Sequence, residues 1–392
     1  MTFGRAIRSE WLLDPDAVYL NHGTVGVVPT VVLDAQTAIR LEIEAHPSER
    51  LLREVTPLSG APREGRPGGR IRGAAASAAA LYRALPDDVA FVDNATTGVN
   101  AVLQSLELGA DDVVVITETT YGGVREAVRY ACRRSGAGLV VARLPCPVES
   151  PEQVVDAVAE ALPSRPTLAI IDHIESETGV VLPLVELVEL CHERGALALV
   201  DAAHAPGQLE LDVPSYGADA YVGNLHKWAM APRSCALLWV APQLQSRIHP
   251  TVVSWNLDRG FVAEFDWIGT RDPSGCLAVP AALDFIDRLD FAKMQDYNHD
   301  LLWRGVALLT ERWGTAAVAP KAMSAFMIAV EMPARFAATK ETGDRLRDQL
   351  LFEHRIEVPV FALAGRLWTR LSVQVYNELE DFERLAAAVE QL

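Results

Sequence analysis

Lysine is scarce in this chain, which has only Lys227, Lys293, Lys321 and Lys340 among its 35 lysine and arginine residues. Positive charge is in short supply as well, since 52 acidic residues leave a formal net charge of −17. This balance disfavours nucleic acids and anionic membrane surfaces as partners. An anionic ligand must therefore be held by a local site and not by the field of the whole molecule.

Cysteine is almost as rare, with five residues that are odd in number and never spaced as Cys-x-x-Cys. That usage argues against a disulfide framework and a zinc site, and it is typical of a reducing cytosol. The N-terminus lacks an apolar signal core, and no run approaches the length of a membrane span. No Gly-x-Gly-x-x-Gly follows an expected strand, which disfavours a Rossmann dehydrogenase. The sequence predicts a cytoplasmic protein without a metal site.

Half of the 392 residues are hydrophobic, which is enough for about two domains. From about residue 89, short β-rich runs alternate with helical stretches, a pattern that predicts an α/β fold with a mostly parallel sheet between two layers of helices. Seven strands are expected, at 89–93, 113–117, 139–144, 167–172, 196–201, 220–223 and 235–240. Helices are expected between them, at 122–134, 151–162 and 184–193.

After about residue 258 the pattern changes to helices with strands over 325–331 and 367–375, which suggests a smaller α/β domain. We expect an N-terminal arm (1–20), a large domain (21–258) and a small C-terminal domain (259–392). Residues 59–73 are rich in glycine, proline and arginine and are expected to form a mobile loop. That loop is either a plain surface loop or a lid whose arginines meet an acidic substrate.

Two chemically matched groups follow apolar strands, where parallel sheets bind their ligands. Lys227 stands in Gly-Asn-Leu-His-Lys-Trp, which overlaps the end of the strand expected at 220–223, and Asp201 ends the strand expected at 196–201. A lysine amine can form a Schiff base with the aldehyde of pyridoxal 5'-phosphate (PLP), and a buried aspartate can keep its pyridine nitrogen protonated. A structural partner such as a buried arginine is the alternative for Asp201. The pair predicts a PLP enzyme.

Other candidate residues leave two interpretations open. Residues 94–100 follow a strand and open a helix, so they form either a phosphate cradle or an ordinary threonine cap. Tyr121 stacks on a planar cofactor or packs in the core. His204 contacts the phenolic oxygen of the cofactor or is a satisfied core histidine. Arg370 clamps a substrate carboxylate or faces solvent.

These motifs, in this order, resemble fold-type I PLP enzymes of the class V aminotransferase superfamily, which includes cysteine desulfurases. Within it the chain is most similar to the isopenicillin N epimerase-like group. The resemblance covers nearly the whole chain and is carried by residues 19–26 (YLNHGTVG), 94–100 (NATTGVN), 201–204 (DAAH), 223–228 (GNLHKW), 269–272 (GTRD) and 370–377 (RLSVQVYN). Desulfurases need a cysteine before the final arginine strand, and residues 359–369 contain none, which argues against persulfide chemistry.

The resemblance implies that Lys227 carries the cofactor as a Schiff base, Asp201 pairs with the pyridine nitrogen and Tyr121 stacks on the ring. The other implied roles are ring-oxygen contacts for His204 and Ser176, phosphate contacts for Ala95, Thr96, Asn224 and His226, a contact from Thr270 to the phosphate of the neighbouring subunit, and substrate binding by Arg370, Asn21 and His22. It also implies a homodimer with active sites at the subunit interface.

The expected partner is a small-molecule substrate, an amino acid. Removal of its α-proton by Lys227 is expected to be followed by loss of a sulfur group from the β-carbon, which is a C–S lyase reaction of secondary metabolism. Epimerisation and decarboxylation-coupled oxidative deamination are the alternatives. A non-catalytic regulatory module is disfavoured, because both Lys227 and Asp201 are present.

Overall fold

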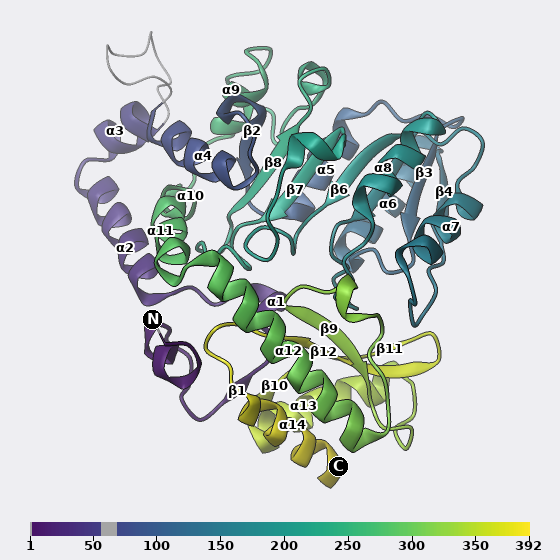
Figure 1. Ribbon diagram of the computed structural model, residues 1–392. Helices are drawn as coiled ribbons and strands as arrows, with labels where there is room; N and C mark the ends of the chain where they lie inside the picture. The colour runs from purple at the N-terminus through teal and green to yellow at the C-terminus, as the bar shows by residue number, and fades with distance from the viewer. Residues whose placement is uncertain (1, 56–68) are drawn as a thin grey trace.

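A seven-stranded sheet is the central layer of the computed structural model, which describes residues 2–55 and 69–392 (Figure 1). Its strands run in the order β2-β8-β7-β6-β5-β3-β4. Only β8 is antiparallel to its neighbours, so the predicted mostly parallel sheet is confirmed. The strands are β2 (Val89–Val92), β3 (Val113–Thr117), β4 (Gly138–Ala142), β5 (Leu168–Asp172), β6 (Leu197–Asp201), β7 (Ala220–Asn224) and β8 (Ala236–Val240).

Helices cover both faces of this sheet, because alternate residues of the same strand enter two different hydrophobic cores. Val222 and Leu238 join one core with α5 and α6, whereas Tyr221 and Leu237 join the other with α7 and α8. These helices are α5 (Ala95–Ser105), α6 (Gly122–Ser135), α7 (Pro151–Ala161) and α8 (Leu184–Glu193). The three helices expected after residue 121 are therefore confirmed.

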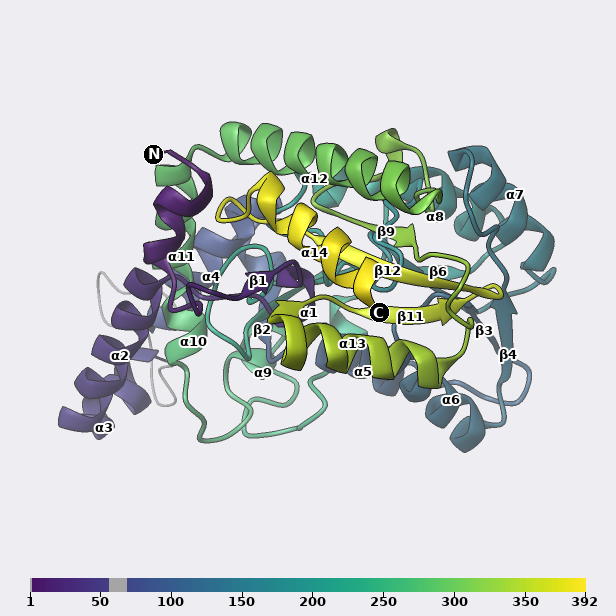
Figure 2. The same ribbon diagram turned by 90° about the horizontal axis from the view of Figure 1, so that it is seen from below.

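A second, antiparallel sheet with the order β11-β12-β9 lies beside the first, with long helices around it (Figures 1 and 2). Its elements are β9 (Met327–Glu331), β11 (Val360–Leu363), β12 (Arg366–Ser372), α12 (Phe291–Trp313), α13 (Lys340–His354) and α14 (Leu379–Gln391). The strands expected near residues 325 and 367 correspond to β9 and β12. The domain boundaries at residues 20 and 258 stay predictions.

Residues 69–73 correct the prediction of a loop over 59–73. They begin helix α4 (Gly69–Leu81), while residues 59–68 lie outside the described ranges. The helix forms because an alanine-rich segment has high helix propensity, and Ile71, Ala75 and Ala78 are buried along one side. It packs against α10 (Ser274–Leu277) and α11 (Val279–Leu289). The remaining helices of this region are α2 (Thr30–Ala45), α3 (Pro47–Glu49) and α9 (Phe261–Asp266). No helix in the described ranges is long and apolar enough to cross a membrane.

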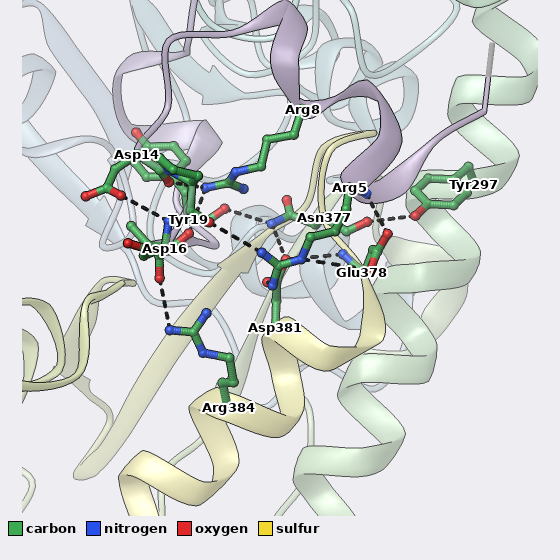
Figure 3. A network of polar contacts seen from close by, with 12 residues as sticks. Arg5, Arg8, Asp14, Asp16, Tyr19, Tyr297, Asn377, Glu378, Asp381 and Arg384 are labelled. Carbon is green, nitrogen blue, oxygen red and sulfur yellow. Dashed lines mark hydrogen bonds and ion pairs between the residues drawn. The ribbon is translucent and has the colours of Figure 1, made fainter.

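The two ends of the chain are tied to each other by polar contacts (Figure 3). Nη2 of Arg5 lies 3.5 Å from Oδ1 of Asp381 in α14. Asn377 Nδ2 donates to the Tyr19 carbonyl at 3.0 Å and to Oδ2 of Asp381 at 2.9 Å. The elements involved are the 3-10 helix η1 (Gly4–Glu10) and the parallel pair of β1 (Val18–Tyr19) and β10 (Ile356–Glu357). The remaining short helical turns are η2 (Arg50–Val55), η3 (Pro86–Asp88), η4 (Val213–Tyr216), η5 (Gln245–Arg247) and η6 (Lys321–Met323).

Helix α1 (His22–Val25) lies between the two sheets (Figure 1). Gly26, which follows it, has a φ of 68°. A Cβ atom there would lie 2.1 Å from the His226 carbonyl oxygen and 3.0 Å from Cα of Lys227. Glycine is therefore required, and it lets the N-terminal segment press against the backbone that carries Lys227.

Candidate active site

A cavity of about 650 Å³ opens where β5, β6 and β7 end. Its walls come from these strand ends, the start of α5, the start of α6, α1 and β12. The lining residues are Gly23, Thr24, Asn94, Ala95, Thr96, Thr97, Tyr121, Gly123, Asp172, Ser176, Asp201, Ala203, His204, Asn224, His226, Lys227 and Arg370. Every predicted site residue except Asn21, His22 and Thr270 therefore lines one cavity.

Lys227 presents its amine in this cavity while the residue as a whole is 8% exposed. Burial lowers the pKa of the amine to about 7, and the charge of Arg370 adds to the shift. Asp201 and Asp172 oppose it as nearby negative charges. Because a large fraction of the amine is uncharged near neutral pH, Lys227 is suited to act as a nucleophile and as a base.

His204 lies against this amine, with its Nε2 atom 3.0 Å from Nζ of Lys227. The indole N–H of Trp228 donates to Nδ1 of His204 at 3.3 Å. An indole is only a donor, so Nδ1 must accept and Nε2 must carry the hydrogen. Burial also lowers the pKa of His204 well below its usual value, so the ring is neutral. His204 is thus a satisfied buried histidine and a cavity residue at the same time.

Asp201 ends β6 and is 2% exposed. Its Oδ1 atom accepts the backbone N–H of Ala203 at 3.0 Å. No arginine pairs with it in the parts of the chain that the structure describes, so the alternative of a buried arginine partner finds no support among those residues. Burial raises the pKa of Asp201, and the Ala203 N–H and the charge of Lys227 offset part of that rise. The carboxyl group is free to meet a cationic ring nitrogen.

The start of α5 is compatible with both interpretations of residues 94–100, as a helix cap and as a phosphate cradle. Asn94, and not a threonine, caps the helix by accepting the N–H of Thr97 at 2.9 Å. Oδ1 of Asn224 accepts the N–H of Ala95 at 2.8 Å. Thr96, in the first turn of the helix, also lines the cavity. A helix of this length with its N-terminus at the cavity is also a suitable place for a phosphate.

His226 lies near this helix end and lines the same cavity. Its Nδ1–H donates to the carbonyl of Cys235 at 2.9 Å, which leaves Nε2 on the other side of the ring. Burial lowers the pKa of His226 to about 4. An anion beside Nε2 would raise that pKa, because a negative charge favours the protonated ring.

Tyr121 is 47% exposed, so it is not an ordinary packed core aromatic. Its ring lines the cavity from the position before α6. A Cβ atom at Gly123 would lie 2.8 Å from Cε1 of Tyr121, so glycine is needed to give the ring this place. The open ring face is suited to stacking on a planar ligand.

Arg370 is 5% exposed, so the alternative of a solvent-facing arginine is wrong. Its Nη2 donates to Oδ1 of Asn21 at 3.0 Å and to Oγ1 of Thr24 at 2.9 Å, and its Nη1 donates to the carbonyl of Ser176. Burial lowers the pKa of the guanidinium to about 10, which still leaves it charged at neutral pH. Nε has no hydrogen-bond partner in the described part of the chain. This is a fixed cation suited to a carboxylate.

Three predicted residues lie outside the cavity. His22 is fully buried behind it, where Nε2 donates to the carbonyl of Lys227 at 3.2 Å and Nδ1 accepts the hydroxyl of Tyr376 at 2.9 Å. Asn21 does not line the cavity, but its Oδ1 accepts hydrogen bonds from two residues that do, Arg370 and Thr24. Thr270 is exposed and does not line the cavity of its own chain. The roles predicted for these three residues stay predictions.

Thr24 and Asp172 are among the lining residues to which the sequence analysis gave no role. Thr24, which accepts from Arg370, stands inside the motif at 19–26, so a signal for it was present. Asp172 ends β5 beside Asp201 and is also buried at 2% exposure. Its position at a strand end was visible in the sequence, but its contact with the cavity was not.

The polar groups of the cavity fit PLP. A carboxyl group without an arginine partner in the described chain stands at one side, suited to a pyridine N–H. A helix N-terminus with the Thr96 hydroxyl and His226 is suited to a phosphate, and the Lys227 amine lies in the same cavity. Lys227 would hold the cofactor covalently, Asp201 its ring nitrogen and Thr96 its phosphate.

Comparisons with known proteins agree with this fit. The family model described as Aminotransferase class-V matches residues 68–385. The chain is 34% identical to the L-cysteine desulfhydrase of Arabidopsis thaliana, over 95% of this chain and 87% of that protein. It is 32% identical to the isopenicillin N epimerase of Streptomyces clavuligerus, over 98% and 97% of the two chains.

Among solved structures, the fold is similar to that of a C-DES mutant with glycine covalently linked to its PLP cofactor. The TM-score is 0.76 at 22% identity, with 95% of this chain and 96% of that chain covered. A likeness at this identity shows the fold, and the family match carries the assignment. The chain therefore belongs to the class-V aminotransferase family, and it is a PLP-dependent enzyme.

Proposed function

We propose that the enzyme is a C–S lyase, which eliminates the sulfur group from the β-carbon of an S-substituted cysteine. The observation that carries the proposal is the buried Lys227 amine, 3.0 Å from Nε2 of His204, in one cavity with the cation of Arg370. The 34% identity to an L-cysteine desulfhydrase supports the same reaction class.

We expect the residues of the cavity to have the following roles in the elimination. Arg370 binds the α-carboxylate and so directs the α-carbon toward Lys227. When bound, PLP supplies an electron-withdrawing ring that stabilises negative charge at that carbon. The uncharged Nζ of Lys227 takes the α-proton, and the electron pair of the C–S bond leaves with the sulfur. Water then supplies the oxygen of the keto acid, so the products are a thiol, pyruvate and ammonium.

The remaining predicted residues would bind the cofactor and complete the site. We assign Asp201 to the pyridine nitrogen, Tyr121 to the ring face, His204 and Ser176 to the ring oxygen, and Ala95, Thr96, Asn224 and His226 to the phosphate. Asn21 and His22, which were predicted to bind the substrate, would do so indirectly, by positioning Arg370 and Lys227. A homodimer in which Thr270 reaches the phosphate of the neighbouring subunit, a cytoplasmic location, a role in secondary metabolism and the division at residues 20 and 258 belong to the same proposal.

Epimerisation is the second candidate, because an isopenicillin N epimerase is 32% identical to this chain. An epimerase needs a second group that returns the proton to the opposite face of the α-carbon. Besides Lys227, the ionisable side chains of the cavity are Tyr121, His204, His226, Asp172 and Asp201. His204 contacts Lys227 itself, and the two carboxyl groups lie at neighbouring strand ends. One base is sufficient for elimination, so this arrangement favours the lyase.

A proton NMR time course in D₂O distinguishes the two reactions. PLP-loaded enzyme is mixed with an S-substituted L-cysteine, and pyruvate and free thiol are expected to appear. Loss of the α-proton signal with the carbon skeleton intact would contradict the lyase and identify an epimerase. Lys227→Ala should abolish turnover in either case. Lys293→Ala is the matched control, since that side chain is 74% exposed and far from the chemistry.

A further inference from the structure

A second carboxyl group shares the floor of the cavity with Asp201. Asp172 ends β5, and the register of the two parallel strands places it directly beside Asp201 at the end of β6. Both residues are 2% exposed and both line the cavity. Oδ2 of Asp172 is buried and has no hydrogen-bond partner among the described residues. Two neighbouring buried carboxyl groups repel each other when both are ionised, so one of them is expected to keep a proton.

The surroundings decide which of the two keeps it. Asp201 accepts the N–H of Ala203 and feels the charge of Lys227, and both contacts favour its ionised form. Asp172 has fewer contacts that favour its ionised form. Burial, the charge of Asp201 and the charge of Glu175 all raise its pKa well above the usual value.

The groups that face Asp172 come from every neighbouring element. Asp201 belongs to β6, Glu175 follows β5, Thr120 follows β3, and Lys227 follows β7. The hydroxyl of Thr120 favours the ionised form, but it is a neutral group against two carboxyl groups. Glu175 is itself buried at 2% exposure. Its two oxygens accept the hydroxyls of threonine side chains, so it has no cation to neutralise it within the described chain.

We propose that Asp172 is a further cofactor-site residue, a protonated carboxyl group that donates a hydrogen bond into the cavity while Asp201 alone is ionised. The ring nitrogen of PLP then meets one negative charge and not two. Oδ2 of Asp172 is closed off and has no hydrogen-bond partner in the described structure, so nothing stabilises a negative charge there, and the hydrogen is donated from the edge of the carboxyl group that lines the cavity. The inference rests on PLP as the cofactor and not on the choice between lyase and epimerase.

Infrared difference spectroscopy tests the protonation directly. Spectra of the holoenzyme and of Asp172→Asn are subtracted, and the stretch of a protonated carboxyl group is expected in the wild type and absent from the variant. A difference that contains only carboxylate bands would overturn the proposal. The measurement does not depend on turnover, so it stands even if the proposed reaction is wrong.

Binding of PLP labelled with nitrogen-15 in its ring tests whether the Asp172 carboxyl group interacts with the cofactor. Asp172→Asn keeps a neutral donor, so the ring nitrogen should stay protonated and the dissociation constant of PLP should change by less than about threefold. Asp172→Leu removes the donor and should weaken PLP by about tenfold, the value of one lost hydrogen bond. Asp201→Asn is the comparison for loss of a carboxylate.

Two results would contradict this assignment. If Asp172→Asn moved the nitrogen-15 signal to that of an unprotonated ring, as expected for Asp201→Asn, Asp172 would be a second carboxylate. If Asp172→Leu folded and bound PLP with unchanged affinity, the side chain would not contact the cofactor. Should Asp172→Leu fail to fold, the Asp172→Asn measurements still decide the question.

Discussion

Nε2 of His204 donates its hydrogen toward Nζ of Lys227 across 3.0 Å, and this direction is set by a third residue. The indole of Trp228 occupies the other ring nitrogen of His204. An ammonium group has no lone pair to accept this hydrogen, so the contact favours the uncharged amine. The site thereby keeps its lysine ready for carbonyl chemistry before any ligand arrives.

Trp228→Phe should disturb this arrangement, because it leaves Nδ1 of His204 buried without its donor. The cost of about 1–3 kcal/mol is expected to lower kcat by about tenfold or more. Steady-state kinetics and nitrogen-15 NMR of the histidine ring measure the effect. Trp239→Phe is the matched control, since that buried indole N–H has no partner in the described chain. Equal losses in the two variants would show that the indole bond has no special role.

Arg370→Lys should raise KM by about tenfold to a hundredfold with a smaller change in kcat, because lysine cannot reproduce the two-pronged contact with a carboxylate. The control is Arg366→Lys on the same strand, where the arginine is exposed and pairs with Glu331 at the surface. Initial-rate kinetics over a range of substrate concentrations separate the two parameters. An unchanged KM in Arg370→Lys would remove this residue from substrate binding.

The lowered pKa of Lys227 predicts a pH-dependent stability of the apoenzyme. The folded-state pKa is about 7 and the ordinary value is 10.5, so between these limits the unfolded chain binds more protons. Stability from this group therefore rises with pH across that window, by up to about 1.4 kcal/mol per pH unit. Urea unfolding of the wild type and of Lys227→Met, compared at each pH, isolates the contribution. Parallel curves would mean that the amine has an ordinary pKa.

Gly26→Ala should destabilise the protein and weaken PLP binding, because the new methyl group would lie 2.1 Å from the carbonyl oxygen of His226. The backbone at a φ of 68° adds further strain. Thermal unfolding and PLP titration are the measurements. Gly73→Ala is the control, as a Cβ there meets nothing within 4 Å and lies in a helix, where alanine is favoured. A Gly26→Ala variant as stable as the control would be inconsistent with this packing.

The parts of the site that could be predicted are those that depend on neighbours in sequence. Asp201 and Lys227 follow apolar strands, and the geometry of parallel sheets brings such positions together. The place of His22 could not be predicted, because it depends on contacts with Lys227 and Tyr376 that are far away along the chain. The place of Asp172 at this edge of the sheet was predictable in the same way as that of Asp201, but its direct pairing with Asp201 depends on the order of the strands.

The loop predicted over residues 59–73 was wrong at its C-terminal end. Its glycine, proline and arginine content favours irregular structure, and that local signal was extended too far toward the C-terminus. Residues 69–73 belong to the helix that continues through Ala74 and Ala75, which are buried against the rest of the molecule. Tertiary packing of the alanines decides the conformation there, and composition alone does not record it.

The long-range bonds of Arg370 have a consequence for biosynthesis. Arg370 donates to Thr24, which was made 346 residues earlier, and Arg5 meets Asp381 close to the opposite end. On the ribosome, Lys227 and Asp201 emerge well before Arg370. A nascent chain can therefore form the cofactor side of the site before it can recognise an amino-acid carboxylate. Selection of a substrate must therefore wait until β12 has been made.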